Sequence, residues 1–168
     1  MAYTLERHAA DCRAALLNEP GPSGRELVRR YTERASTDPE FVAKYFGPEA
    51  NSERQILYED PDLHFCILSH VYRGARNSLP HDHGPSWAIY CQVAGITEMT
   101  DWRLVQKPAD GRPGKVEKVR TYNLTPGTAH IYNEGDLHSP RREGDTRLIR
   151  IEGRDLTKVH RDKFEEAA

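Results

Sequence analysis

The stretch Leu79-Pro80-His81-Asp82-His83-Gly84 indicates both the chemistry and the architecture of this protein. Two histidines one residue apart on an extended segment direct their side chains to the same side of the backbone, so one metal ion can bind both. Asp82, between them, points to the opposite side. A catalytic transition metal usually needs at least three protein ligands. We expect the third to be His138, in Gly135-Asp136-Leu137-His138, arriving from a facing strand of a barrel.

The length and charge of the chain exclude several classes of protein. A chain of 168 residues is long enough for one domain with a proper core and too short for two comfortable ones. Its 24 Lys and Arg against 26 Asp and Glu give a net charge of −2, which is not the basic excess of a nucleic-acid-binding protein. We therefore expect a single domain whose partners do not include nucleic acid.

Cysteine usage and hydropathy predict the compartment. Cys12, Cys66 and Cys91 are an odd number without CxxC spacing, which argues against a disulfide framework and against a thiolate zinc site. No basic-then-apolar leader opens the chain, and no run approaches the roughly 18 apolar residues of a membrane span. The sequence therefore predicts a cytoplasmic protein without a membrane partner.

Three helices are expected within residues 1–50. Apolar residues at helical spacing predict the first over residues 5–16. A capping-box pattern that begins at Ser23 predicts a second helix to about residue 35. Asp38-Pro39 supplies an N-cap and a first-turn proline for the third.

Residues 51–156 predict a β barrel. Short segments rich in β-branched and aromatic residues are separated by turn residues, and a polar hairpin loop is expected over 107–114. Many short strands imply a jelly-roll barrel, so the fold class is mainly β, with the helices packed on the barrel and residues 157–168 as a C-terminal tail. The predicted strands are 55–59, 63–72, 87–93, 96–105, 116–123, 129–132 and 147–152.

The order of Gly74, His81-Asp82-His83, Gly95 and a later lone histidine resembles the two metal-binding motifs of the cupin superfamily, whose fold is a double-stranded β-helix. Ordinary cupins carry a glutamate ligand shortly after the second histidine, whereas residues 86–88 here are Ser, Trp and Ala. Without that carboxylate, and with a helical layer and a Gly-x-Leu-His motif, the sequence resembles the thiol dioxygenases, the cysteine dioxygenase branch, over about residues 53–156.

This resemblance implies a non-haem Fe(II) site with His81, His83 and His138 as ligands. In such enzymes the substrate binds through a thiolate, and both atoms of dioxygen reach its sulfur. Three neutral imidazoles leave a divalent ion its full charge of +2, which favours an anionic, chelating substrate. The resemblance also implies that Arg54 pairs with the substrate carboxylate through its planar fork, with Gln55 as the alternative shifted by one residue.

The last predicted strand departs from this branch. The family has the histidine and tyrosine of a Ser-His-Tyr relay where this sequence has Arg150 and Glu152, and Ala88 replaces a cysteine that some members crosslink to the tyrosine. Because alternate residues share a face, Arg150 and Glu152 are expected in the pocket, as an ion pair or as catalytic groups. Trp87 and Tyr90 are expected at the pocket mouth, where Trp87 would contact substrate, with packing into the barrel wall as the alternative.

A few further residues bear on the site. His130 and His70 are alternatives to His138 as third ligand, although a strand histidine such as His70 is more often a satisfied core residue. Arg142 stands about where many cupins have an asparagine after the third histidine. Three histidines without partners at useful spacing are expected to be exposed, namely His8, His64 and His160.

The leading hypothesis is an Fe(II)-dependent dioxygenase of cysteine dioxygenase type, which uses O2 to convert a small thiol carboxylate into a sulfinate. A second hypothesis keeps the site and cleaves a carbon–carbon bond of a dicarbonyl compound, with Arg150 neutralising charge. A third is a metal-containing cupin that binds a small ligand without turnover, since the cupin scaffold hosts many chemistries. Three imidazoles also bind other divalent transition metals. A homodimer is compatible with the sequence.

Overall fold

The computed structural model describes all residues, 1–168. Three helices come first, namely α1 (Leu5–Asn18), α2 (Pro22–Thr37) and α3 (Pro39–Phe46). The strands that follow are β1 (Gln55–Glu59), β2 (Cys66–Tyr72), β3 (Arg76–Asn77), β4 (Ala88–Ala94), β5 (Thr97–Gln106), β6 (Gly114–Leu124), β7 (Ala129–Tyr132), β8 (Leu137–Arg142), β9 (Thr146–Glu152) and β10 (Phe164–Glu166). A short 3-10 helix, η1 (Leu156–Lys158), lies between β9 and β10.

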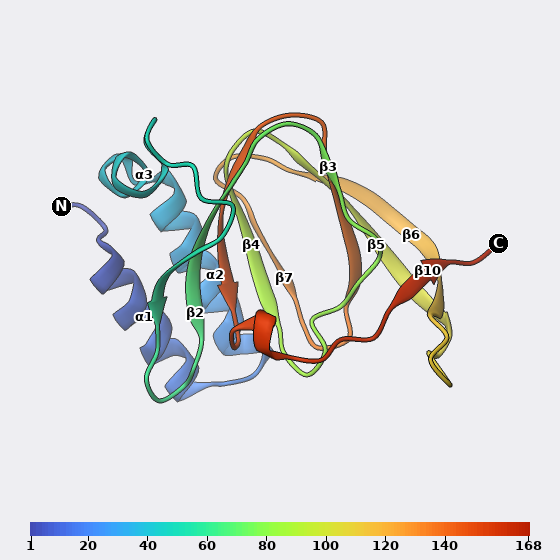
Figure 1. Cartoon of the computed structure of the whole chain (residues 1–168). Helices are drawn as coiled ribbons and strands as arrows, with labels where there is room; N and C mark the ends of the chain where they lie inside the picture. The colour runs from blue at the N-terminus through green and yellow to red at the C-terminus, as the bar shows by residue number, and fades with distance from the viewer.

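The strands form two five-stranded sheets that face each other across the interior (Figure 1). One sheet has the order β1-β2-β9-β4-β7 and the other the order β10-β6-β5-β8-β3. Neighbouring strands pair antiparallel, except that β10 runs parallel to β6. Strands that are distant in sequence, such as β2, β9 and β4, lie side by side. This is the predicted mainly β, single-domain fold, the double-stranded β-helix with an N-terminal helical layer.

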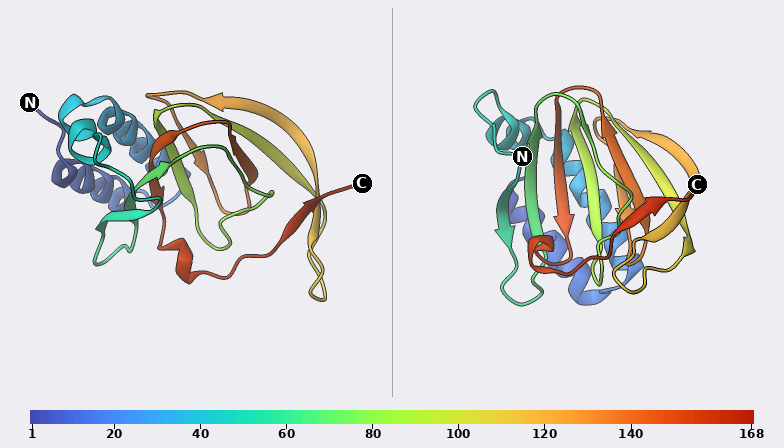
Figure 2. Two further views of the ribbon diagram at one scale, coloured as in Figure 1. Left: turned by 45° about the horizontal axis from the view of Figure 1, so that its top comes forward. Right: turned by 45° about the vertical axis from the view of Figure 1, so that its right-hand side comes forward.

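The helices cover the outer face of the sheet that contains β4 and β9 (Figure 2). α2 packs on β4, β7 and β9, α3 packs on β2, and α1 packs on α2 and β1. None of the three helices has the length and apolar character needed to span a bilayer. The predicted helical layer thus supports one wall of the barrel from outside.

The predicted N-terminal cap is present in α3 and absent in α2. Asp38 caps α3 as predicted, because its side chain accepts hydrogen bonds from the backbone amides of Glu40 and Phe41. α2 was expected to start with a capping box at Ser23, which is wrong. It begins instead at Pro22 with Gly21 as N-cap and no side-chain cap, since the fixed φ of proline suits the first helical position and its missing amide would have no partner there.

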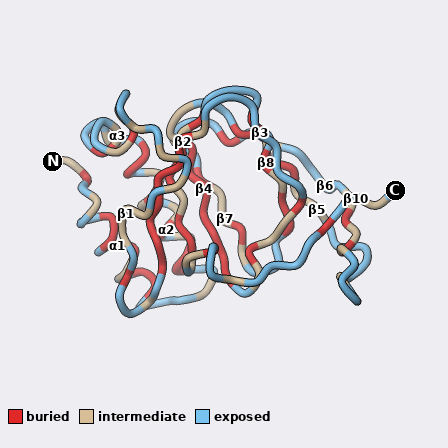
Figure 3. Tube along the Cα trace, in the orientation of Figure 1, coloured by how far each residue is buried: buried red, intermediate tan, exposed pale blue.

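Side chains on β4 divide the molecule into two cores. Ile89 and Cys91 pack with the helices, whereas Ala88 and Tyr90 belong to the cluster inside the barrel. β4 is buried along most of its length (Figure 3). Burial of apolar surface between helices and sheet is the main stabilising contribution to the fold. The helical core also contains His8, which is fully buried and lies 3.1 Å from the hydroxyl of Thr32 through Nε2. The expectation that His8 is exposed was therefore wrong, because it lies on the buried side of α1.

Three strands have no counterpart among the predicted ranges, and one of them, β8, carries His138, which was expected on a facing strand. Its sequence, Leu-His-Ser-Pro-Arg-Arg, lacks the β-branched residues that identify strands. The C-terminal residues 157–168 were expected only as a tail. They return along the barrel, and β10 joins the second sheet beside β6 with Phe164 buried. These residues therefore form part of the wall of the barrel.

Candidate metal centre

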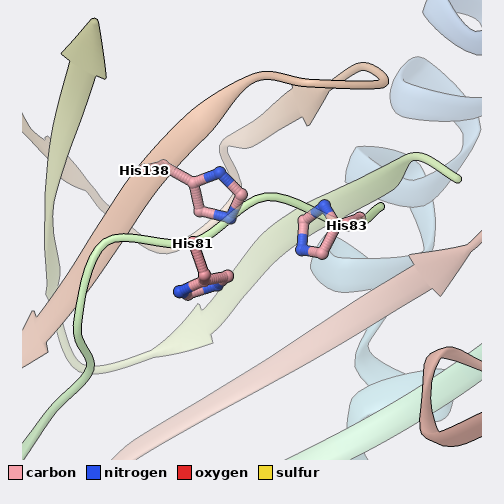
Figure 4. Close-up of side chains that lie close together, drawn as sticks. All are labelled: His81, His83 and His138. Carbon is pink, nitrogen blue, oxygen red and sulfur yellow. The ribbon is translucent and has the colours of Figure 1, made fainter. Parts of the chain in front are cut away.

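Three histidines converge inside the barrel (Figure 4). A ligand nitrogen from each of His81, His83 and His138 lies within 4.8 Å of the other two. The ring centroids of His81 and His138 are 4.5 Å apart, and those of His83 and His138 are 4.7 Å apart. The structure thus brings together the three residues expected as ligands, and no carboxylate belongs to the cluster.

Backbone pairing explains how residues so far apart in sequence meet. The amide of His81 donates to the carbonyl of His138 over 3.0 Å, and the amide of His138 donates back over 2.9 Å. This isolated bridge attaches the His-Asp-His segment to β8. Asp82 does not belong to the cluster, and its side chain accepts a hydrogen bond from the amide of Gly84. Gly84 has a positive φ of 58°, which a glycine adopts without strain.

Hydrogen bonds from Nδ1 to backbone carbonyls orient two of the imidazoles. Nδ1 of His81 donates to the carbonyl of Leu79 over 2.8 Å, and Nδ1 of His138 donates to the carbonyl of Asp136 over 2.9 Å. A carbonyl can only accept, so the ring proton sits on Nδ1 and Nε2 keeps its lone pair. This is the usual arrangement of metal-bound histidines. Both Nε2 atoms are therefore available as ligands.

Burial keeps the three rings neutral. Desolvation lowers the pKa of His81 to about 4 and the pKa values of His83 and His138 further below the ordinary value. The nearby charge of Arg150 lowers all three pKa values as well. Because a metal ligand must be deprotonated, the site is ready to bind at neutral pH. Three neutral imidazoles fit a divalent first-row transition metal.

Two tyrosines enclose the cluster. The hydroxyl of Tyr90, on β4, lies 3.1 Å from Nε2 of His83 and 3.4 Å from Nε2 of His138. Tyr132 stacks on the ring of His138 with 4.0 Å between centroids. From the sequence, Tyr90 was expected only at the pocket mouth and Tyr132 was not identified, although both alternate inward with their strands. The Tyr90 hydroxyl therefore lies beside two of the three candidate ligands.

Arg150 and Glu152 share the inward face of β9, as the alternation of the strand predicted. Nη1 of Arg150 lies 3.5 Å from Oε1 of Glu152, and the guanidinium lies 4.4 Å from the centroid of Tyr90. Glu152 is 1% exposed, and its Oε2 accepts from the amide of Leu156. The predicted ion pair is present, and it reaches the metal cluster through the ring of Tyr90.

Arg54 and Trp87 lie elsewhere. Nη2 of Arg54 donates to Glu152 over 2.8 Å and to Asp155 over 2.9 Å, so its charge is already paired with carboxylates of this chain. Gln55, the alternative, is exposed. Trp87 packs in the helical core, with the guanidinium of Arg25 5.1 Å from its ring. The structure therefore does not bring Trp87 to the histidines, because it lies on the helix-facing side of the sheet.

The alternative third ligands are also outside the cluster. Nδ1 of His70 lies 2.6 Å from the carbonyl of Glu53, and the ring stacks on Tyr72. His130 packs between Tyr122 and Tyr132. Neither belongs to the group of nitrogens that could share an ion. His138 is the histidine that completes the set.

A cavity of about 1000 Å³ opens beside His81. His81 and Tyr90 form part of its wall, and two arginines, Arg142 and Arg150, lie in the same wall. The C-terminal segment closes another side through residues 161–165. A small molecule in this cavity can therefore contact both His81 and the arginines.

Comparisons with known proteins concern the fold. No family model matches the chain, and no curated protein matches it. KdgF from Halomonas sp. is 19% identical, with a TM-score of 0.46 over 63% of this chain and 83% of that one. A conserved protein with a double-stranded β-helix domain from Klebsiella pneumoniae is 13% identical, with a TM-score of 0.48 over 74% and 88%. A cupin-2 domain protein from Shewanella frigidimarina is 12% identical, with a TM-score of 0.44 over 63% and 85%. The assignment of the double-stranded β-helix rests on the two facing sheets, and these likenesses assign no reaction.

Proposed function

We propose that this protein is an Fe(II)-dependent dioxygenase of the cysteine dioxygenase type that oxidises a small thiol carboxylate to a sulfinate. The observation that carries the proposal is a buried site of three neutral histidines, without a carboxylate ligand, beside a cavity lined by arginines. In the reaction both oxygen atoms of O2 become bonded to the sulfur of the thiolate, so that RS⁻ and O2 give RSO2⁻. The iron would supply the binding position for the thiolate and the activation of O2.

The side chains around the cluster support an anionic substrate. His81, His83 and His138 add no negative charge to the site, so a bound divalent ion attracts anionic groups. Arg150 adds a positive charge next to Tyr90, whose hydroxyl lies beside His83 and would donate a hydrogen bond to an anionic group bound at the metal. Burial raises the pKa of Tyr90, which keeps this hydroxyl protonated as a donor.

The chain would replace the family's relay with different groups. Ala88 stands where some thiol dioxygenases carry the crosslinking cysteine, and Arg150 stands at the expected place of the relay histidine. Tyr90 brings a hydroxyl to the cluster from another strand, β4. We infer that Tyr90 orients the groups bound beside the histidines, while Arg150 stabilises negative charge.

A second candidate function is the cleavage of a dicarbonyl compound. The position of Arg150 beside the cluster favours it, because a guanidinium there can neutralise an enolate oxygen. The same three histidines would hold the metal. A third candidate is a cupin that binds a small ligand without turnover.

Oxygen uptake distinguishes these candidates. The protein is expressed without added metal and analysed for bound metal, then loaded with Fe(II) and mixed with cysteine, 3-mercaptopropionate or acetylacetone. We expect oxygen consumption with a thiol and a sulfinate product identified by mass spectrometry. Uptake with acetylacetone alone would support dicarbonyl cleavage, and no uptake with any compound would support a binding protein. A His138→Ala variant is the control for reactions of free iron, because it retains the pocket but loses a ligand.

A further inference from the structure

Arg142 is an unusually placed charge. It is 3% exposed, and its Nε donates to the hydroxyl of Thr97 over 3.1 Å. Its guanidinium lies 4.7 Å from the ring centroid of Tyr72, and it makes no ion pair. Nη2 of Arg142 is buried without a hydrogen-bond partner. A buried charge without a partner is costly, so such a group is a candidate for a ligand contact.

Arg150 presents a second incompletely bonded guanidinium. It rests on Tyr90, its single carboxylate neighbour is Glu152 at 3.5 Å, and its Nε is buried without a partner. The two arginines come from opposite sheets, since Arg142 lies on β8 and Arg150 on β9, yet both line the cavity that includes His81. Stacking on tyrosine rings holds both side chains in place before any ligand arrives.

The charges around this cavity do not balance. Its cationic lining residues outnumber its acidic ones, and they are Arg76, Arg142, Arg150, Arg161 and Lys163 against Asp162 and Glu165. Arg76 is paired with Glu53 and Arg150 with Glu152, whereas Arg161 and Lys163 are exposed to solvent. Arg142 is therefore a buried cation of this wall without a carboxylate. A ligand carboxylate in the cavity would supply one.

We propose that Arg142 and Arg150 together form the carboxylate receptor of the substrate, in place of Arg54. This inference rests on the proposed function for the identity of the rest of the substrate. The excess of positive charge around the cavity does not depend on a bound metal. The two guanidinium groups, which both line the cavity, supply charge-assisted hydrogen bonds to the carboxylate, and the reactive end of the molecule reaches the side of the cavity formed by His81 and Tyr90. The substrate class is a short carboxylate whose second functional group can bind a metal.

Binding of a carboxylate probe tests the receptor. Propionate is titrated into the Fe(II)-loaded protein under nitrogen and into protein freed of metal by a chelator, with 1-propanol as the neutral counterpart. We expect propionate to bind in both forms and 1-propanol to bind in neither. Arg142→Gln and Arg150→Gln should each weaken propionate binding about tenfold or more, because each removes charge-assisted hydrogen bonds. Arg103→Gln is the matched control, since Arg103 is 71% exposed and lies outside the cavity.

Two further variants keep the test decisive. Arg142→Lys retains the charge if Arg142→Gln fails to fold, and it should bind propionate with an intermediate affinity because a lysine lacks the planar fork. Arg54→Gln should leave propionate binding in place. Loss of binding in Arg54→Gln together with unchanged binding in Arg142→Gln would overturn the receptor, and so would the absence of propionate binding by the parent protein.

Steady-state kinetics separate this inference from the proposed function. If a thiol carboxylate is oxidised and Arg142→Gln leaves kcat/KM unchanged, the receptor is wrong while the dioxygenase stands. If propionate binds through Arg142 and Arg150 but no thiol is oxidised, the receptor stands while the dioxygenase is wrong.

Discussion

On strand β9, Ile149 and Ile151 face the helices whereas Arg150 and Glu152 face the barrel interior. The two faces of this one strand therefore have different roles. The outer face buries apolar side chains against α2, which contributes to the stability of the fold. The inner face holds charges whose nitrogens and oxygens are only partly bonded, including Nε of Arg150 and Oε1 of Glu152. Incomplete bonding on the inner face is what a ligand can complete.

The largest effect is expected on the inner face, at a metal ligand. His138→Ala removes one of three imidazoles, so metal affinity should fall about a hundredfold or more. Competition with a chelating dye measures the affinity, and circular dichroism shows whether the fold remains. His64→Ala is the control because His64 is exposed. Equal metal affinity in His138→Ala and the parent protein would refute the three-histidine site.

A substitution that leaves an empty space on the outer face should lower stability but leave metal binding unchanged. Ile89 is fully buried between β4 and the helices, so Ile89→Ala should lower the free energy of unfolding by about 2–5 kcal/mol. Guanidinium chloride unfolding measures the loss. Ile96→Ala, at a side chain that is 53% exposed, should cost far less. A variant at Ile89 that changed the metal content while remaining folded would contradict the separation of the two faces.

The outer core also contains a titrating group, His8. Burial lowers the pKa of His8 to about 4, from 6.5 in the unfolded chain. Between these pH values the unfolded chain binds a proton that the folded protein does not. Stability from this group is therefore present above pH 6.5 and is lost as the pH falls toward 4, by up to about 3 kcal/mol. His8→Gln removes the titration, so the stability of the metal-free parent should fall more steeply with acid than that of the variant. Parallel pH profiles would refute this.

The smallest change in stability is expected at Tyr90. Tyr90→Phe removes one hydroxyl that lies near two ligand nitrogens, so the free energy of unfolding should change by about 1 kcal/mol. The histidines remain, and metal content should stay the same. Oxygen uptake with the thiol substrate should fall about tenfold or more, because the hydroxyl positions the reacting groups. Tyr122→Phe is the matched control. Equal rates in Tyr90→Phe and Tyr122→Phe would exclude this role.

Much of the site could be predicted from local patterns. The His-Asp-His spacing indicated two ligands, and alternation along the last long strand indicated that Arg150 and Glu152 share a face. Asp38-Pro39 marked the start of α3. Each of these predictions depends on residues within a few positions of one another, where backbone geometry limits the arrangements.

Contacts between distant residues were harder to predict. Trp87 was expected near substrate but lies on the helical side, and Arg54 is bound to Glu152 and Asp155. His138 was expected on a facing strand, but the range of that strand was not predicted because its polar residues and proline are not typical of a strand. His8 was expected on the surface because no partner at useful spacing was identified for it in the sequence, although helical spacing places it on the same side of α1 as Cys12. Its partner, Thr32, comes from α2.

The amino-acid sequence alone was enough to indicate a β barrel with a helical layer and a histidine pair suited to a metal, because periodicity and spacing act over a few residues. The tertiary structure decided which charges remain unpaired. Arg54 is neutralised by carboxylates far along the chain, whereas Arg142 lies in the cavity wall without one. Such pairing depends on which strands become neighbours, and strand order follows from burial over the whole chain.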